Sequence, residues 1–427
     1  MKRRALFTLV MATTALATSS AAIAGSFALR EQSTRGQGLA FAGVAAGSAG
    51  LSSLYWNPAW MSERSGLQFE ANLSAILPYS NVTPQTGTSP ILLGATGTGE
   101  SGDIASDTLL PSLYASYQLS ENAWLGLSTN TPYGLSTKYK DPFPGQVYAT
   151  SSKVFSFDVN PSFTYAVNDW LSLGAGIQVM YFSTNLQRSL SPVPYAPTAT
   201  LDGDDVGFGG TAGVTFTPFE GTEIGVGWRS PIELNLEGDL TLQARSGMLP
   251  AGTYPIQAGI TLPEIVTIGL RHQLTSQLEL NAGFEWTNWS RLGTIPVVST
   301  AGPATGATLT NLYFEYDDGY YASLGAEYDF NARWSMRGGL AYEWSPISTS
   351  TRDLRLPDAD RLHAALGASY TWKDRLTVDL AYTHIFTMGD GDIELTPGNP
   401  SYITGLPFVG SVDSGVDLIS LGASYRF

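Results

Sequence analysis

The chain has 427 residues, of which 14% are charged, 43% are hydrophobic and 11% are aromatic. A soluble globular domain usually carries about 25% charged residues, and a disordered chain would lack the 10 Trp, 21 Tyr and 18 Phe found here. Beyond residue 25, no apolar run approaches the ~18–20 residues of a membrane-spanning helix. The net charge of −15 argues against a nucleic-acid partner, which would require a basic patch. The composition therefore favours one large β structure in an apolar solvent.

The first residues have the pattern of an export signal. Three basic residues at positions 2–4 precede an apolar stretch over 5–17, and Ala22-Ile23-Ala24 provides a small-x-small cleavage site. We expect residues 1–24 to be a cleaved signal peptide, and an uncleaved anchor helix is the less favoured alternative. The chain contains no cysteine, so the exported fold is expected to be stable without disulfides.

From residue 67 onward, segments of about ten residues are apolar at every second position. This period of two predicts β-strands, because successive side chains of a strand point to opposite faces. Aromatic residues at the ends of the apolar faces, opposite small and polar residues, are typical of a membrane barrel. In residues 361–372 the apolar face consists of Leu362, Ala364, Leu366, Ala368, Tyr370 and Trp372.

The number of such segments predicts the architecture. Six short connections alternate with seven long ones, as expected for an antiparallel barrel with an even number of strands. Long loops are expected near residues 80–107, 139–153, 185–205, 237–261, 291–318, 345–360 and 387–416. Fourteen strands are expected to begin near Leu67, Thr108, Ala123, Val154, Trp170, Val206, Thr222, Leu262, Gln277, Gly319, Arg333, Arg361, Arg375 and Asp417.

Residues 25–66 precede the first expected strand and show no clean alternation. They are rich in glycine but also carry aromatic residues such as Trp56 and Trp60, too many for a solvated tail. A barrel of this size would leave an aqueous lumen unless something filled it. We therefore expect an all-β fold, a 14-stranded antiparallel transmembrane β-barrel over residues 67–427 with residues 25–66 as a plug inside it.

A motif in the expected plug resembles a known family. Trp56-Asn57-Pro58-Ala59 is similar to the Asn-Pro-Ala motif of FadL-type outer-membrane transporters of long-chain fatty acids and other hydrophobic compounds. Further stretches resemble the family in the same order along the chain, at residues 27–31, 131–135, 262–264, 313–325 and 356–361. The resemblance implies a monomer in the outer membrane of a Gram-negative bacterium that takes up hydrophobic compounds by passive, energy-independent diffusion.

The resemblance also suggests residues that bind the cargo. Phe27 falls where the family's N-terminal segment reaches the binding pocket, and Arg188 falls where the family has an arginine implicated in holding a carboxylate. The alternative for Arg188 is an arginine at the base of a loop. Asn57, Pro58 and Ala59 are expected to fix the geometry of the plug, since Asn-Pro favours a turn. A second basic residue is expected near Tyr316, but Asp317 and Asp318 follow that residue here. The cargo therefore remains either a fatty acid or a neutral aromatic or alkane hydrocarbon.

In the family, cargo is thought to leave sideways through the wall where the third strand is kinked. Pro132, Tyr133 and Gly134 match that segment. Proline lacks an N–H for strand pairing, and glycine tolerates unusual backbone angles. The alternative is that Pro132 merely begins a long loop.

Other function classes are less well supported. The three histidines, His272, His363 and His384, have no metal-site spacing, so we expect no catalytic residues, metal or cofactor. A general-diffusion porin would need an open lumen, and an adhesin or phage receptor would depend on the surface loops. The expected partners are the cargo, outer-membrane lipid and lipopolysaccharide, and the barrel-assembly machinery.

Overall fold

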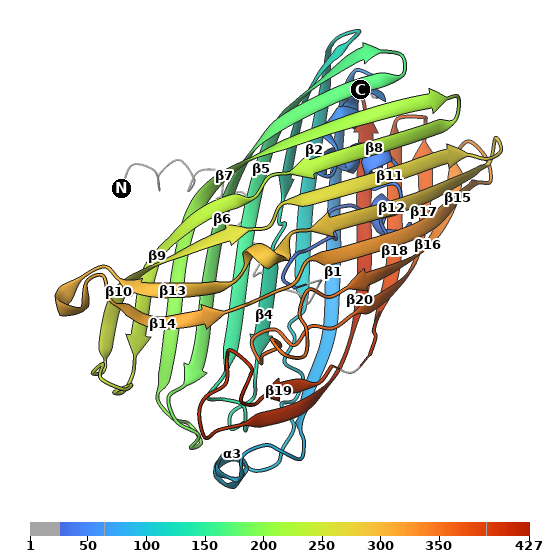
Figure 1. Cartoon of the computed structure of the whole chain (residues 1–427). Helices are drawn as coiled ribbons and strands as arrows, with labels where there is room; N and C mark the ends of the chain where they lie inside the picture. Colours follow the sequence, from blue (N-terminus) through green and yellow to red (C-terminus); the bar gives the residue numbers. More distant parts are fainter. Residues whose placement is uncertain (1–25, 64, 390) are drawn as a thin grey trace.

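The computed structural model describes residues 26–63, 65–389 and 391–427. The signal peptide expected over residues 1–24 lies outside these ranges. The described chain forms one antiparallel barrel with the N-terminal segment inside it (Figure 1). Among the described residues, no helix is long and apolar enough to cross a membrane.

The strands account for most of the chain after residue 66. Their bounds are β1 (Leu67–Pro84), β2 (Thr108–Ser120), β3 (Ala123–Asn130), β4 (Gly134–Lys138), β5 (Ser151–Asn168), β6 (Leu171–Ser189), β7 (Thr198–Phe219), β8 (Thr222–Arg229), β9 (Ile232–Leu242), β10 (Gly252–Leu262), β11 (Ile265–Gln273), β12 (Leu278–Thr287), β13 (Thr294–Ser299), β14 (Thr308–Tyr313), β15 (Gly319–Asp329), β16 (Trp334–Trp344), β17 (Arg361–Trp372), β18 (Leu376–Thr387), β19 (Ile393–Leu395) and β20 (Phe408–Arg426).

These strands form a closed barrel of fourteen wall strands within the described residues. Nine wall strands are continuous, and five are each interrupted to give the pairs β3/β4, β8/β9, β10/β11, β12/β13 and β14/β15. The remaining strand, β19, pairs with β20 alone. The barrel is closed by β1 and β20, whose pairing runs from Gln68↔Arg426 to Pro84↔Gly410. The predicted 14-stranded barrel is confirmed, because period-two alternation reports the wall strands directly.

The wall extends beyond its expected length at one end. Loops are expected over residues 185–205, 237–261 and 291–318, but strands occupy most of the first two ranges, and β13 and β14 lie within the third. In β9, Ile232, Leu234 and Leu236 point inward and are buried, while the polar residues between them are exposed. The alternation therefore continues, but here the apolar side chains point inward and the polar ones outward, because this part of the wall encloses an apolar interior.

The plug, defined here as residues 26–63, lies inside the barrel near its short-turn end (Figure 1). Its helical turns contact wall strands on several sides, and almost every plug residue is buried. Outside the plug, helical turns occur in the long loops and at one wall interruption. The helical elements are α2 (Thr34–Gln37), η1 (Val44–Ala46), η2 (Gly50–Tyr55), η3 (Pro58–Glu63), α3 (Pro90–Thr96), η4 (Trp289–Arg291) and η5 (Gly302–Ala304).

Glycines on the inner wall allow the plug backbone to lie directly against the strands. A Cβ on Gly225 would come within 1.8 Å of the Ala45 carbonyl oxygen, and one on Gly227 equally close to that of Trp56. No substituent can be accommodated at that distance from a backbone atom without moving the plug.

Candidate functional site

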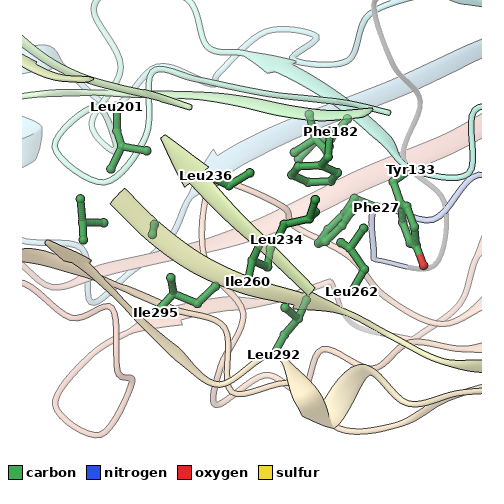
Figure 2. Packing of buried hydrophobic residues seen from close by; sticks show 14 of the residues in the cluster. Phe27, Tyr133, Phe182, Leu201, Leu234, Leu236, Ile260, Leu262, Leu292 and Ile295 are labelled. Carbon is green, nitrogen blue, oxygen red and sulfur yellow. The ribbon is translucent and has the colours of Figure 1, made fainter. Parts of the chain in front are cut away.

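An apolar cavity lies inside the barrel on the long-loop side of the plug. It is lined mainly by inward-facing residues of β5, β6, β7, β9, β10 and β13 and of the loop after β16. Figure 2 shows several of these side chains, such as Phe182, Leu236 and Ile260, pointing toward one another from different strands. We call it the deep cavity; its apolar lining includes Phe27, Leu135, Val154, Phe182, Leu201, Leu236, Ile256, Ile260, Ile295, Leu312, Ile347 and Leu356.

Phe27 forms the plug's contribution to the deep cavity. Its side chain is 3% exposed, and its ring centroid lies 4.8 Å from that of Trp289 and 6.5 Å from that of Phe182. Figure 2 shows the ring between Phe182 and Tyr133, whose centroid is 5.8 Å away. A movement of the N-terminal segment would therefore reshape the cavity.

A second cavity, the outer cavity, adjoins the deep cavity on the loop side. The two share Leu186, Leu201, Leu312 and Arg355 in their linings, so they form consecutive parts of one path. Arg188, near the end of β6, lines the outer cavity and does not line the deep one.

Two arginines give the outer cavity its positive charge. The Arg188 Nη1 donates a 3.4 Å hydrogen bond to the Val147 carbonyl oxygen, while the Arg355 Nη1 lies 2.6 Å from Asp353 Oδ2. Arg188 therefore has donors left for a ligand, whereas Arg355 is already paired. Arg355 was not among the expected site residues, because it lies in a loop without periodic pattern. Arg355 and Tyr316 both line the deep cavity.

Tyr148 forms another part of the outer cavity. Its hydroxyl donates a 2.6 Å hydrogen bond to the Leu406 carbonyl oxygen, and burial raises the pKa of Tyr148 to about 12. Tyr148 therefore remains neutral at physiological pH and ties the loop after β4 to the loop before β20.

The wall is interrupted beside the deep cavity, between β3 and β4. β2 pairs with β3 only as far as Leu113↔Thr129, and the chain then passes through Thr131, Pro132 and Tyr133 before β4 begins. Because β4 continues the wall by pairing with β5, Pro132 lies in a short break between two strands of the wall. Gly134 does not adopt a positive φ, so the interruption does not depend on its conformational freedom.

The first residues of the plug pair with this interruption. Leu29 N donates a 2.7 Å hydrogen bond to the Pro132 carbonyl oxygen, and Gly134 N donates a 2.9 Å hydrogen bond to that of Phe27. Ala28 and Tyr133 thus form an antiparallel bridge. The segment that carries Phe27 into the deep cavity therefore also takes the place of a strand at the break.

The Asn-Pro-Ala motif fixes a turn of the plug against the wall. Asn57 Nδ2 donates hydrogen bonds of 2.7 Å to the Ala45 carbonyl oxygen and 3.0 Å to that of Val214 in β7. Asn57 Oδ1 accepts a 3.0 Å bond from Ala59 N, and Pro58 begins η3. None of the three residues lines either cavity.

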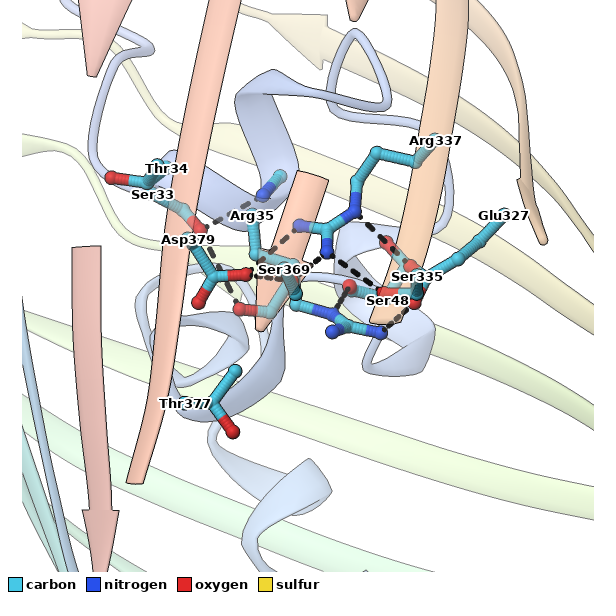
Figure 3. Close-up of polar contacts among 12 residues, drawn as sticks. Ser33, Thr34, Arg35, Ser48, Glu327, Ser335, Arg337, Ser369, Thr377 and Asp379 are labelled. Atoms are coloured by element: carbon cyan, nitrogen blue, oxygen red, sulfur yellow. Dashed lines mark hydrogen bonds and ion pairs between the residues drawn. The ribbon is translucent and has the colours of Figure 1, made fainter. Parts of the chain in front are cut away.

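Ion pairs fasten the plug to the wall. Arg35 of α2 lies 2.6 Å from Glu327 of β15, which is also 3.3 Å from Arg337 of β16, as Figure 3 shows. Arg30 lies 2.5 Å from Glu285 and 3.2 Å from Glu343. These buried charges are paired, as the low dielectric of the interior requires.

The family comparison matches nearly the whole chain. Residues 15–427 match the family described as outer membrane protein transport protein (OMPP1/FadL/TodX). This chain belongs to that family. The FadL-type resemblance seen in the sequence is therefore confirmed, and the chain is an outer-membrane transporter of fatty acids or hydrophobic aromatic compounds.

Individual members of the OMPP1/FadL/TodX family are distant in sequence. Outer membrane protein P1 of Haemophilus influenzae is 26% identical over 88% of this chain and 89% of its own length. A long-chain fatty acid transport protein of Escherichia coli is 26% identical over 92% of this chain and 95% of its own length.

Solved structures share the fold. The crystal structure of a Pseudomonas aeruginosa FadL homologue superposes with a TM-score of 0.83 at 23% identity, covering 95% of this chain and all of that chain. The Ralstonia pickettii toluene transporter TbuX has a TM-score of 0.66 at 18% identity and covers 92% of this chain and 98% of its own.

The histidines lie apart from both cavities. His363 faces the lumen, with Nε2 3.2 Å from Glu343 Oε2, and His384 Nδ1 lies 2.8 Å from Asp417 Oδ1. Among the residues that the structure describes, no three His, Cys, Asp or Glu side chains are grouped so that they could hold a metal ion.

Proposed function

We propose that this transporter binds long-chain fatty acids or related hydrophobic compounds and passes them across the outer membrane by passive diffusion. Cargo enters the outer cavity, moves into the deep cavity, and leaves sideways through the wall between β2 and β4. The single observation that carries the proposal is that Phe27 lines the deep cavity while its neighbours pair with the interrupted strand.

The apolar lining of the deep cavity supplies the driving force for loading. Burial of each CH₂ group contributes about 0.8 kcal/mol, so an alkyl chain can bind without specific polar contacts. Release requires a coupled rearrangement. Withdrawal of the N-terminal segment would remove Phe27 from the cavity and expose the edge of β4 at the same time.

The choice between an acid and a neutral hydrocarbon depends on the outer cavity. A carboxylate could be held there by Arg188, since a guanidinium group can donate two parallel hydrogen bonds. The lining of the deep cavity, in contrast, is mainly apolar, and its arginine, Arg355, is already paired with Asp353. We propose a fatty acid with its carboxylate in the outer cavity; a neutral aromatic or alkane hydrocarbon is the second candidate.

Ligand binding to the purified protein tests the cargo. We expect oleate to bind, and Arg188→Ala to weaken oleate binding about tenfold, because one charge-assisted hydrogen bond of roughly 1.5–3 kcal/mol is lost. Arg333→Ala, in an exposed short turn far from the cavities, is the control. Binding of toluene but not oleate would select the hydrocarbon, and binding of neither would reject the transporter proposal.

A disulfide across the break tests the exit route. The chain has no cysteine, so Ala28→Cys and Tyr133→Cys would introduce its only thiols. Ala28 and Tyr133 form a non-hydrogen-bonded pair, because the hydrogen bonds join the residues on either side of them. The Cα atoms of such a pair lie close enough for a disulfide. We expect the oxidised protein to bind cargo but to transport it at least tenfold more slowly than the reduced protein. Equal transport by both forms would exclude this exit.

The remaining assignments belong to the same proposal. They are the division into a signal peptide (1–24), a plug (25–66) and a barrel (67–427), function as a monomer, and contacts with lipopolysaccharide and the barrel-assembly machinery. Measurement of the mature N-terminus and of the mass in detergent would test the first two.

A further inference from the structure

The break between β3 and β4 leaves part of the wall without strand pairing. Above the pair Leu113↔Thr129, β2 continues toward Thr108 and still pairs with β1 on its other side. The backbone N–H and C=O of Thr131 have no partner on β2. Buried backbone groups without partners are costly, so something must bond to them.

Gln32 of the plug bonds to both of these backbone groups. Its Nε2 donates a 2.8 Å hydrogen bond to the Thr131 carbonyl oxygen, and its Oε1 accepts a 3.4 Å bond from Thr131 N. A carboxamide carries one donor side and one acceptor side, as a peptide group does. The fully buried Gln32 side chain therefore replaces the missing strand partner of Thr131.

The same residue is bonded to β2 through its main chain. The Gln32 carbonyl oxygen accepts hydrogen bonds of 2.7 Å from Ser112 Oγ and 2.8 Å from the Tyr114 hydroxyl. Asn130 Nδ2, at the end of β3, donates 3.0 Å to Gln32 Oε1 and 2.7 Å to the Tyr114 oxygen. One plug residue thus joins both edges of the break.

Gln32 also controls the segment that occupies the cavity. Its Nε2 donates a further 3.0 Å hydrogen bond to the Leu29 carbonyl oxygen, only two residues from Phe27. The contacts of Gln32 therefore connect three parts of the molecule: the β2 edge, the β3 edge and the segment that carries Phe27.

We infer that Gln32 is the positioning residue that holds the lateral break closed, and that its side-chain amide must release Thr131 before the break can open. This inference deepens the proposed function and rests on it for its link to transport. The structural part, closure of the break by the amide, stands on the hydrogen bonds alone.

Hydrogen–deuterium exchange at the break tests the inference. Gln32→Met keeps the length of the side chain but removes its donor and acceptor. We expect the amides of Thr131 and Gly134 to exchange at least about tenfold faster than in the wild type, which corresponds to the loss of roughly one hydrogen bond. Gln32→Met should also release pre-bound oleate into lipid vesicles faster than the wild type does.

Gln37→Met is the matched control. Gln37 is equally buried in the plug, but its Nε2 donates to the Leu418 carbonyl oxygen of β20, on another part of the wall. We expect it to leave exchange at Thr131 and Gly134 unchanged. If Gln32→Met fails to assemble, Gln32→Glu serves instead, because a carboxylate cannot donate to the Thr131 carbonyl oxygen and should also accelerate exchange.

The outcomes separate this inference from the proposed function. Unchanged exchange in the assembled Gln32 variant, or equal acceleration by Gln37→Met, would overturn the role of Gln32. If the wild type bound neither oleate nor toluene, the proposed function would fail, while the exchange comparison would still decide whether Gln32 closes the break.

Discussion

At the scale of single residues, glycines on the inner wall determine where the plug can pack against the strands. Gly225 and Gly227 alternate with outward-facing apolar residues, and each allows a plug carbonyl oxygen to approach the strand. The glycines explain how a small plug can be packed tightly inside a wide barrel. Their positions on inward-facing registers are visible in the sequence, but the backbone that they contact is not.

Gly225→Ala should therefore loosen the plug. The added Cβ would overlap the Ala45 carbonyl oxygen at 1.8 Å, and overpacking of this kind typically costs about 1–3 kcal/mol. The matched control is Gly259→Ala in β10, where no atom lies within 4 Å of the new Cβ. Urea unfolding in detergent should show a loss of stability for the first variant only; equal stability of both would contradict the packing argument.

At the scale of elements, several strands are interrupted where the wall changes direction. The break between β10 and β11 is held by Glu264, whose Oε1 accepts hydrogen bonds of 2.8 Å from Asn288 Nδ2 and 3.0 Å from Arg291 Nη2. Glu264 therefore joins this break to η4, which separates β12 from β13. The deep cavity lies on the loop side of these joined breaks, so their geometry sets the position of its wall.

Glu264→Ala should destabilise this junction moderately. It removes three hydrogen bonds to partly exposed groups, from Asn288, Arg291 and Trp228, for which we expect a combined loss of about 1–2 kcal/mol in unfolding free energy. Glu121→Ala, an exposed carboxylate in the turn between β2 and β3, should leave stability within about 0.5 kcal/mol. A similar effect of both variants in thermal unfolding would show that Glu264 does not join the breaks.

At the scale of the whole molecule, the plug completes the electrostatics of the lumen. The buried charged residues of the described wall strands comprise more carboxylates than arginines. Arg30 and Arg35 of the plug, which also carries the buried Glu31, pair with three of these wall carboxylates. These wall residues are Glu70, Asp158, Glu285, Glu327, Glu343 and Asp379, with Arg229, Arg337 and Arg361.

Deletion of residues 26–63 should consequently turn the barrel into a cation-selective pore. We expect the full chain to show no large open channel in planar bilayers, and the deletion variant to conduct with a preference for K⁺ over Cl⁻, because unpaired carboxylates would line the lumen. Heat-dependent gel mobility would verify that the variant barrel is folded. Large conductance in the full chain would instead support the general-diffusion porin.

The sequence by itself determined the architecture of this protein. Alternation with period two depends only on local backbone geometry, so it predicted fourteen strands and the positions of the short turns. The inverted alternation in β9 and β10 was also present in the sequence, although residues 237–261, which include the end of β9 and nearly all of β10, were expected to form a loop. The Asn-Pro-Ala motif likewise predicted the family.

Only the tertiary structure decided how the parts of the site meet. Phe27 contacts Phe182, which lies 155 positions later in the sequence. Gln32 bonds to Thr131, which lies 99 positions later. Arg355 lines the outer cavity from a loop without periodic pattern. No local pattern encodes such contacts, because they arise when the barrel closes and brings a plug, a broken strand and a loop to one place. The wall strands are predictable because the same local backbone geometry repeats along the chain. The binding path is not, because it forms only when the barrel closes.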